Sequence, residues 1–134
     1  MNTVVAFDAL RVSKVKKEIS LSKDTDIFFS KKERRTAQTK AHPFEGLTAR
    51  LAAKRAFFKV LNQMGYSFPG TMNRLEILND PHGRPFFNFL DKKFRDFCRV
   101  NITEIFLSLT HTRRIGSALV AIDLKRNSSQ SDKR

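Results

Sequence analysis

The stretch that decides the fold is "LTARLAAKRAFFKVL", which spans Leu47–Leu61. On a helical wheel at about 100° per residue, its alanines and several large apolar residues fall on one broad arc. This periodicity predicts a helix that is buried along the arc and continues to about residue 62. The arc consists of Ala49, Ala52, Ala53, Ala56, Phe57, Val60 and Leu61.

Cations interrupt this helix in two rows with i, i+4 spacing. Arg50 and Lys54 form one row, and Arg55 and Lys59 form the other, with a second apolar strip between them. Long cationic side chains can lie along a half-exposed helix and reach solvent with their charged ends. Alternatively, the two rows surround a ligand that carries phosphate groups. The segment alone does not choose between these two interpretations.

The composition indicates one folded, strongly basic domain. The chain has 134 residues, of which 40% are hydrophobic and thirteen are Phe, which argues against disorder. Twenty-six Lys and Arg against thirteen Asp and Glu give a formal net charge of +13. Such a charge attracts polyanions, whether nucleic acid, an anionic membrane, a phosphorylated small molecule or an acidic protein.

The cysteine content and the first residues indicate the compartment in which the protein is found. The single cysteine, Cys98, excludes an internal disulfide, and its aromatic surroundings favour a small buried apolar residue over a catalytic thiol. The start "MNTVVAFDAL" has neither the basic segment nor the long apolar segment of a signal peptide. No run approaches the roughly 18 apolar residues of a membrane span. We therefore expect a cytoplasmic protein without a membrane partner.

The remaining segments predict an α+β fold. A short β-branched run, 3–7, predicts a strand that ends at Asp8, and 9–21 predicts a loop or short helix with a basic exposed face. Ser30 and Glu33 have the spacing of a capping box, so a helix should begin there. Residues 73–80 and 86–90 predict a hairpin, 91–100 a helix, and 104–111 and 116–124 two further strands. Together they predict an antiparallel sheet packed on one long helix over residues 1–125, followed by a disordered basic tail at 126–134.

Several side chains could belong to a site, although each has a structural alternative. Asp8 at a strand end can reach a metal or a cation, and the turn "DPHGRP" can present its amides and Arg84 to an anion or can simply connect two strands. His111 is followed by Thr112 and two arginines, but a lone histidine is usually structural. The sequence has no metal-ligand spacing of His and Cys, no Walker loop, no dinucleotide fingerprint and no RNA-binding signature.

Taken in order, four segments resemble the holo-acyl-carrier-protein synthases, which are small 4'-phosphopantetheinyl transferases. The segments are "VVAFDAL", "RLAAKRAFFK", "LEILNDPHGRPFF" and "LSLTHTRRIGSALVAI", and the resemblance covers residues 3–124. It implies an α+β fold and a homotrimer with active sites at the subunit interfaces. The implied reaction moves phosphopantetheine from coenzyme A to a serine of an acyl carrier protein and releases 3',5'-ADP.

The resemblance also assigns roles by position. It implies that Asp8 binds magnesium and that the basic segment containing Arg11, Lys14 and Lys17 docks the acidic carrier protein. The catalytic residues that we take from it are Asp8, Arg55, Lys59 and His111. The expected coenzyme A contacts or supports are Arg50, Lys54, Lys59, Gly83, Arg84, Pro85, His111 and Thr112.

One position departs from the family pattern at the metal site. Arg55 stands where the family has a magnesium-binding Glu, and a cation cannot serve as an oxygen ligand. We therefore predict that Arg55 acts as a built-in cation, paired with Asp8 and able to bind a diphosphate. Two other functions stay open: a non-catalytic relative that binds carrier protein or coenzyme A, and, ranked last, a nucleic-acid-binding domain suggested only by charge and Phe content.

Overall fold

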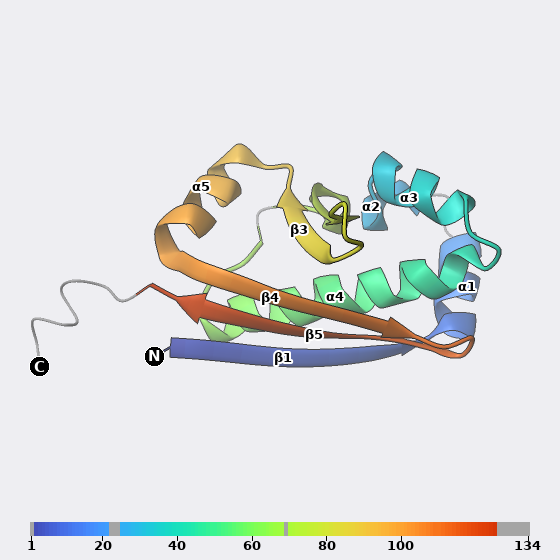
Figure 1. Ribbon diagram of the computed structural model, residues 1–134, viewed down its shortest axis with the longest axis horizontal. Coiled ribbons are helices and arrows are strands. Elements are labelled where there is room, and N and C mark those ends of the chain that lie inside the picture. Colours follow the sequence, from blue (N-terminus) through green and yellow to red (C-terminus); the bar gives the residue numbers. More distant parts are fainter. Residues whose placement is uncertain (1, 22–24, 69, 126–134) are drawn as a thin grey trace, which may run out of the picture.

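The fold is built on one three-stranded antiparallel sheet (Figure 1). The computed structural model describes residues 2–21, 25–68 and 70–125, so the tail expected at 126–134 lies outside the described residues. The strand order is β1 (Asn2–Arg11), β5 (Ile115–Leu124) and β4 (Ile102–His111), which makes β1 and β4 the two edges. The long helix α4 (Pro43–Gln63) crosses one face of this sheet.

Shorter elements complete the layer on the same side as α4 (Figure 1). At one end lie α1 (Val12–Leu21), α2 (Thr25–Phe28) and α3 (Lys31–Gln38). A separate two-stranded sheet consists of β2 (Leu75–Asn79) and β3 (Pro85–Phe89), preceded by the 3-10 turn η1 (Met72–Arg74) and followed by α5 (Lys92–Asn101). The α+β class is confirmed, and this second sheet shares the covering layer with α4.

Most predicted elements are present, including the capping box, in which the Ser30 hydroxyl accepts from the Glu33 amide and the Glu33 carboxylate accepts from the Ser30 amide. The first strand was predicted too short. It continues to Arg11 because Ala9, Leu10 and Arg11 still pair with β5. Asp8 therefore lies within β1 rather than at its end, and it is buried.

Small residues let α4 lie very close to the sheet. Ala49, Ala52 and Ala56 are completely buried. On β5, a Cβ atom placed on Gly116 would lie 2.5 Å from the backbone nitrogen of Ala49, which is closer than real Cβ atoms come. Only glycine fits there without moving the helix, so the start of α4 is held against β5 at backbone distance.

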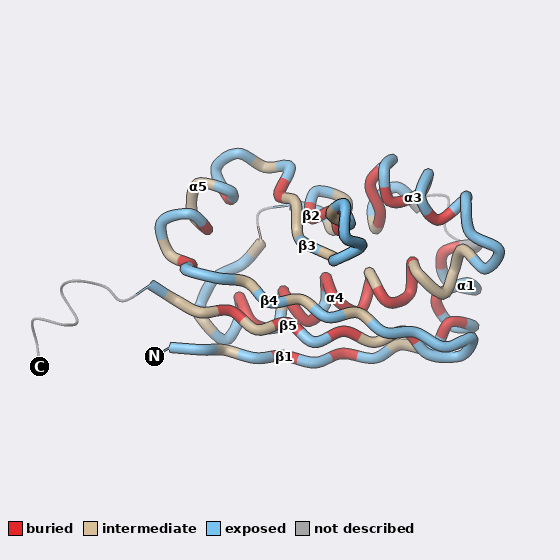
Figure 2. Tube along the Cα trace, viewed as in Figure 1, coloured by how far each residue is buried: buried red, intermediate tan, exposed pale blue. Residues whose placement is uncertain are grey.

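The opposite face of the sheet carries exposed apolar side chains. Buried and exposed residues alternate along β1 and β5, as Figure 2 shows. Val5, Phe7, Leu119 and Phe106 are 52%, 59%, 37% and 55% exposed, and Phe7 pairs directly with Leu119. We call these four residues the outer apolar face. A patch of this kind on a sheet is typical of a surface that another protein covers.

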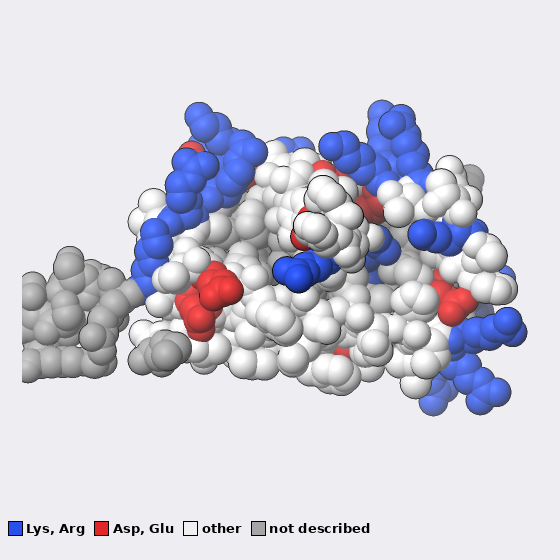
Figure 3. All heavy atoms as spheres, viewed as in Figure 1, with Lys and Arg blue, Asp and Glu red and all other residues white. Residues whose placement is uncertain are grey.

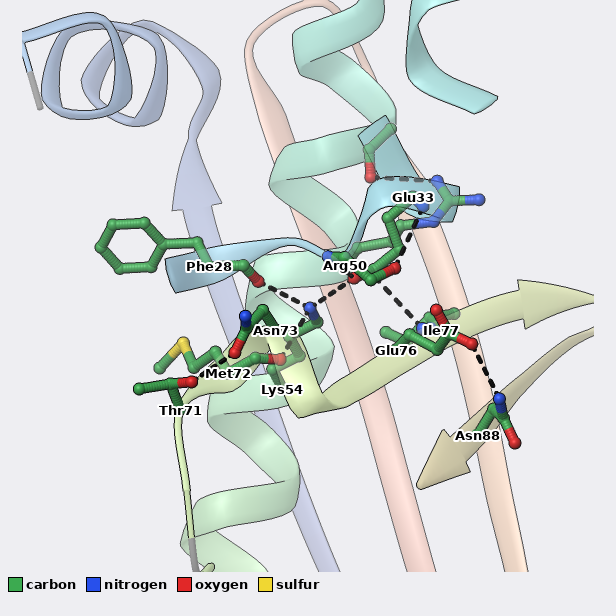
Figure 4. A network of polar contacts seen from close by, with 12 residues as sticks. Phe28, Glu33, Arg50, Lys54, Thr71, Met72, Asn73, Glu76, Ile77 and Asn88 are labelled. Atoms are coloured by element: carbon green, nitrogen blue, oxygen red, sulfur yellow. Dashed lines mark hydrogen bonds and ion pairs between the residues drawn. The ribbon is translucent and has the colours of Figure 1, made fainter. Parts of the chain in front are cut away.

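A buried polar network ties the α2–α3 segment and η1 to α4 (Figure 4). The Nζ of Lys54 is completely buried and lies 2.7 Å from Glu33 Oε1, 2.7 Å from the Phe28 carbonyl and 3.0 Å from the Met72 carbonyl. The other oxygen of Glu33 accepts the Ile77 amide of β2 at 3.2 Å. All three ammonium protons therefore have acceptors, and five elements meet at one ion pair: α2, α3, α4, η1 and β2.

The first prediction concerns the stability that this ion pair provides. Replacing Lys54 by Met leaves the Glu33 carboxylate buried without its cation, and we expect the free energy of unfolding to fall by about 3–5 kcal/mol. The matched control is Lys59→Met on the same helix, where the side chain is half exposed, so the change should stay below about 1 kcal/mol. Chemical denaturation measures both values, and equal losses for the two variants would contradict this account.

Candidate functional site

The predicted site residues lie in two groups on opposite flanks of α4. Arg50 and Arg55 are five positions apart, which places them about 140° apart around the helix axis. Arg55 contacts β1, whereas Arg50 lines a pocket that β4 also lines. Because β1 and β4 are opposite edges of the sheet, the two cationic rows do not face a common ligand within one chain. The expectation that they surround one ligand is corrected accordingly.

The first group, the β1-edge cluster, consists of Asp8, Arg55 and Lys59. The Nε of Arg55 lies 2.9 Å from Asp8 Oδ2, and the Nζ of Lys59 lies 3.2 Å from Asp8 Oδ1. Lys59 also approaches the Phe7 carbonyl at 3.4 Å. Within the described chain Oδ2 accepts no aligned hydrogen bond, so the Arg55 contact is an ion pair. The predicted pairing of Arg55 with Asp8 is confirmed.

The second group lines a pocket of about 580 Å³ at the other edge, which we call the β4-edge pocket. Its wall combines the start of α4, the turn between β2 and β3, the end of α3 and the end of β4. Of the predicted residues, it contains Arg50, Gly83, Pro85 and His111. The volume falls in the range of pockets that hold small-molecule ligands. The structure thus brings these four residues together, although the first and the last lie about sixty positions apart in the sequence.

Arg50 gives this pocket an anion-binding character. Its side chain is half buried, and its Nε is buried with no hydrogen-bond partner among the described residues. One Nη contacts the Gly46 carbonyl at 3.4 Å, which is a long and weak contact. Burial lowers the pKa of the Arg50 guanidinium, and the nearby Glu33 carboxylate opposes that shift. An arginine guanidinium in a pocket wall is suited to a carboxylate or a phosphate.

Sequence reasoning missed Glu45, which lies in the same wall. Its carboxylate is 3.5 Å from His111 Nδ1 and 3.9 Å from His42 Nδ1, so it stands between two imidazoles from different elements. Glu45 therefore orients the His111 ring from one side of the pocket. The available signal was its place in the first turn of α4, three residues after His42, since acidic residues favour helix starts.

The turn between β2 and β3 does not offer the anion-binding amides that its sequence suggested. Asp80 uses its own carboxylate to accept the amides of His82 at 2.8 Å and Arg84 at 2.9 Å. The Gly83 amide donates to the Asp80 carbonyl, and Gly83 itself has a φ of +81°. These amides are already used, so the plain connecting turn is the correct interpretation and Arg84 can contribute only its side chain.

Two further predicted contacts have structural roles. The Thr112 hydroxyl accepts the amides of Arg114 and Ile115 at 3.1 Å each, so it stabilises the turn between β4 and β5. Lys54 was expected as a coenzyme A contact or support, but its ammonium is completely buried and bound to Glu33 and two carbonyls. It cannot reach a ligand from there and supports α4 from within.

Comparison with known proteins places the chain in a family. No protein-family model matches the chain. A holo-(acyl-carrier-protein) synthase from Syntrophus aciditrophicus is 34% identical over 95 residues, which cover 71% of this chain and 73% of that protein. The chain belongs to the holo-(acyl-carrier-protein) synthase family. Another member, from Treponema denticola, is 31% identical over 123 residues and covers 89% of this chain and 96% of that protein.

A solved structure of the family also matches the fold. The ACPS–CoA complex of Chronobacterium ammoniagenes has a TM-score of 0.79 and 26% sequence identity, and the match covers 94% of this chain and 100% of that chain. The similarity therefore extends over nearly the whole fold.

The magnesium site that the family resemblance implies does not fit the residues present here. Both oxygens of Asp8 face cations, and the described chain has no group of three or more His, Cys, Asp or Glu residues that could hold a metal ion. Magnesium requires several oxygen ligands in octahedral geometry. Two like charges about 4 Å apart near a protein surface repel by about 4 kcal/mol. Asp8 is thus a partner of two cations rather than a metal ligand.

Basic residues dominate the surface around this family fold. Figure 3 shows Lys and Arg side chains gathered over α5 and over the end of the molecule that α1 and α3 form. The α1 helix buries Val12 and Val15 and exposes Lys14 and Lys17, and Arg11 at the end of β1 is exposed beside it, as the sequence predicted. Among the described helices, none is long and apolar enough to cross a membrane.

Cys98 takes no part in this site. It is buried beside the aromatic core, and loss of solvation raises the pKa of its thiol to about 12. The thiol is therefore neutral and unreactive at neutral pH, which agrees with its interpretation as a small apolar core residue.

Proposed function

We propose that the chain transfers 4'-phosphopantetheine from coenzyme A to a serine of an acyl carrier protein. The observation that carries this proposal is the β4-edge pocket, whose wall holds Arg50 and His111 at positions that match the family motifs. Its volume suits the nucleotide portion of coenzyme A, and the Arg50 guanidinium in its wall suits a phosphate group. The β1-edge cluster supplies two more cations for the remaining phosphates.

The proposed reaction is a phosphoryl transfer that the cationic side chains of the two groups can assist. The oxygen of the carrier serine gives up its proton to solvent and forms a bond to the β-phosphorus of coenzyme A, while the bond from that phosphorus to the bridging oxygen breaks and the bridging oxygen leaves with 3',5'-ADP. The products are the serine phosphopantetheine ester and 3',5'-ADP. Phosphoryl transfer of this kind depends chiefly on positioning and on stabilising negative charge, which cationic side chains can provide.

A complete site requires two copies of the chain in this proposal. The β1-edge cluster and the β4-edge pocket face away from each other across α4, so a single ligand must bridge one copy's cluster and the next copy's pocket. That contact is heterologous, because different surfaces of the two copies meet. Heterologous contacts close into rings such as a trimer, whereas a two-fold dimer pairs identical surfaces. The geometry thus supports the expected homotrimer.

The outer apolar face supports the same assembly. Phe7, Phe106 and Leu119 lie on the sheet face that α4 leaves uncovered. Packing three copies of this face around one axis would remove these side chains from water and would also bring the β1 edge of one copy toward the β4 edge of the next. One assembly therefore accounts for both the exposed apolar residues and the divided site.

The second prediction tests the transfer itself. Incubating the protein with coenzyme A and a panel of apo-acyl carrier proteins should give a carrier protein heavier by one phosphopantetheine group, read by mass spectrometry. Reactions should be run with and without Mg²⁺. His111→Ala should lower the rate because the variant alters the pocket wall. Lys125→Ala serves as the control, because this residue follows the end of β5 that lies far from the pocket. Absence of the adduct with every carrier protein would contradict the proposal.

The third prediction tests whether two copies share each site. Asp8→Asn damages the β1-edge cluster, and His111→Ala damages the β4-edge pocket. Each variant alone should be impaired, but trimers reassembled from an equal mixture should contain some sites built from two undamaged halves. We therefore expect the mixture to recover part of the activity. No recovery after confirmed subunit exchange would mean that both groups act within one copy.

The fourth prediction concerns carrier-protein docking on the end of β1 and on α1. Reversing Arg11 and Lys14 to Glu should weaken binding of the acidic carrier protein, while coenzyme A affinity should stay unchanged. Raising the salt concentration should mimic the reversal, since exposed charges are screened over about 10 Å at 0.1 M ionic strength. Binding of each partner can be measured separately by calorimetry. Equal losses for both partners would show that α1 is not a dedicated docking surface.

A non-catalytic member of the family is the second candidate. The observation that favours it is the cation at position 55, where the family pattern has an acidic metal ligand. Such a protein would bind coenzyme A or carrier protein without forming the adduct. Mass spectrometry combined with binding measurements distinguishes the two functions.

A further inference from the structure

We propose that the β1-edge cluster binds the diphosphate of coenzyme A without a divalent cation, and that Arg55 supplies the positive charge. This inference rests on the proposed function, because it takes coenzyme A to be the ligand. It goes beyond that function by stating how the site works with no metal ion. Three features of the cluster carry it: its occupied carboxylate, its free cationic ends and its net charge.

The occupied carboxylate leaves no place for a metal ion. Arg55 Nε stands 2.9 Å from one oxygen of Asp8, and Lys59 Nζ stands 3.2 Å from the other. A magnesium ion would have to lie about 2.0–2.1 Å from one of these oxygens, beside a guanidinium or an ammonium. No other acidic side chain of the described residues joins Asp8 to complete a ligand set.

The cationic ends remain available to a ligand. The Arg55 side chain is 45% exposed and the Lys59 side chain is 49% exposed, whereas the side chain of Asp8 is only 10% exposed. Arg55 contacts Asp8 through Nε, so its two terminal amino groups are not needed for this ion pair. A guanidinium can therefore hold a carboxylate with one edge and present a second pair of donors to a phosphate.

The net charge of the cluster has the sign that a diphosphate requires. One carboxylate and two cations sum to one positive charge. The cations are half exposed and the carboxylate is buried beneath them, so a ligand in solvent meets the positive charge first. Asp8 acts here as a positioning residue, since it holds Arg55 and Lys59 on the β1 edge. In this way the chain itself contributes the charge that a bound cation would otherwise bring.

The test compares coenzyme A binding in Mg²⁺ with binding in EDTA, by isothermal titration calorimetry of the full chain. We expect the two dissociation constants to agree within about threefold. Arg55→Ala should weaken binding by about tenfold or more, the usual effect of removing a hydrogen bond between charged groups. Arg55→Lys should keep part of the affinity, because it retains the charge but loses the second donor pair.

Metal binding provides an independent readout without coenzyme A. Titration of the wild-type protein with Mn²⁺, followed by electron paramagnetic resonance, should show no binding at this cluster. Arg55→Glu should gain a Mn²⁺ site and make coenzyme A binding depend on Mg²⁺. The matched control is Arg55→Gln, which removes the cation without adding a carboxylate and should gain neither property. Thermal melts confirm that the variants fold, as expected for a half-exposed position.

The outcomes separate this inference from the proposed function. Wild-type binding of coenzyme A that requires Mg²⁺, or unchanged affinity in Arg55→Ala, would overturn the metal-free site and leave the proposed function intact. Failure of the folded wild-type protein to bind coenzyme A under either condition would overturn both. Three results together would establish the inference. The wild-type protein binds coenzyme A equally well in Mg²⁺ and in EDTA, Arg55→Ala loses this affinity, and Arg55→Glu binds coenzyme A only with Mg²⁺.

Discussion

The close approach of α4 to the sheet is the constraint on which both parts of the candidate site depend. Alanines on the buried arc and Gly116 on β5 leave almost no side-chain volume between helix and strands at the start of α4. Arg55 and Lys59 can reach Asp8 only because the helix lies this low over β1. The same approach brings Arg50 and the start of α4 to the edge of β4, where the pocket forms.

Much of the fold could be predicted because its signals are local. The period of the apolar arc gives α4, the capping box gives α3, and Pro81 and Gly83 mark the hairpin turn. The extension of β1 to Arg11 was not predictable in this way, since it depends on pairing with β5 more than a hundred residues later. Strand ends are set by their partners, and partners are not visible in a short window.

The site was less predictable, because a helical wheel shows which residues share a face but not what covers it. Lys54 and Lys59 are the same residue type on the same helix, but the Lys54 side chain is buried and the Lys59 side chain is half exposed. The α2–α3 segment and η1 cover Lys54 and surround it with acceptors, while Lys59 stays at the open β1 edge. Asp80 is a different case, because an aspartate that accepts nearby amides in a turn follows a local rule.

A fixed guanidinium and a bound metal ion can both neutralise the negative charge of a diphosphate, but they do so by different means. Magnesium concentrates two charges on one small ion, but it must be recruited from solution and it needs a set of oxygen ligands. Arg55 offers a single, delocalised charge that is always present, together with donors that match phosphate oxygens. In nucleotide triphosphatases that also hold Mg²⁺, one added arginine stabilises the phosphoryl-transfer transition state by about 10³–10⁵ in rate. The pairing with Asp8 fits this role, because a buried carboxylate can hold the guanidinium in place at Nε and leave the outer donors to the diphosphate.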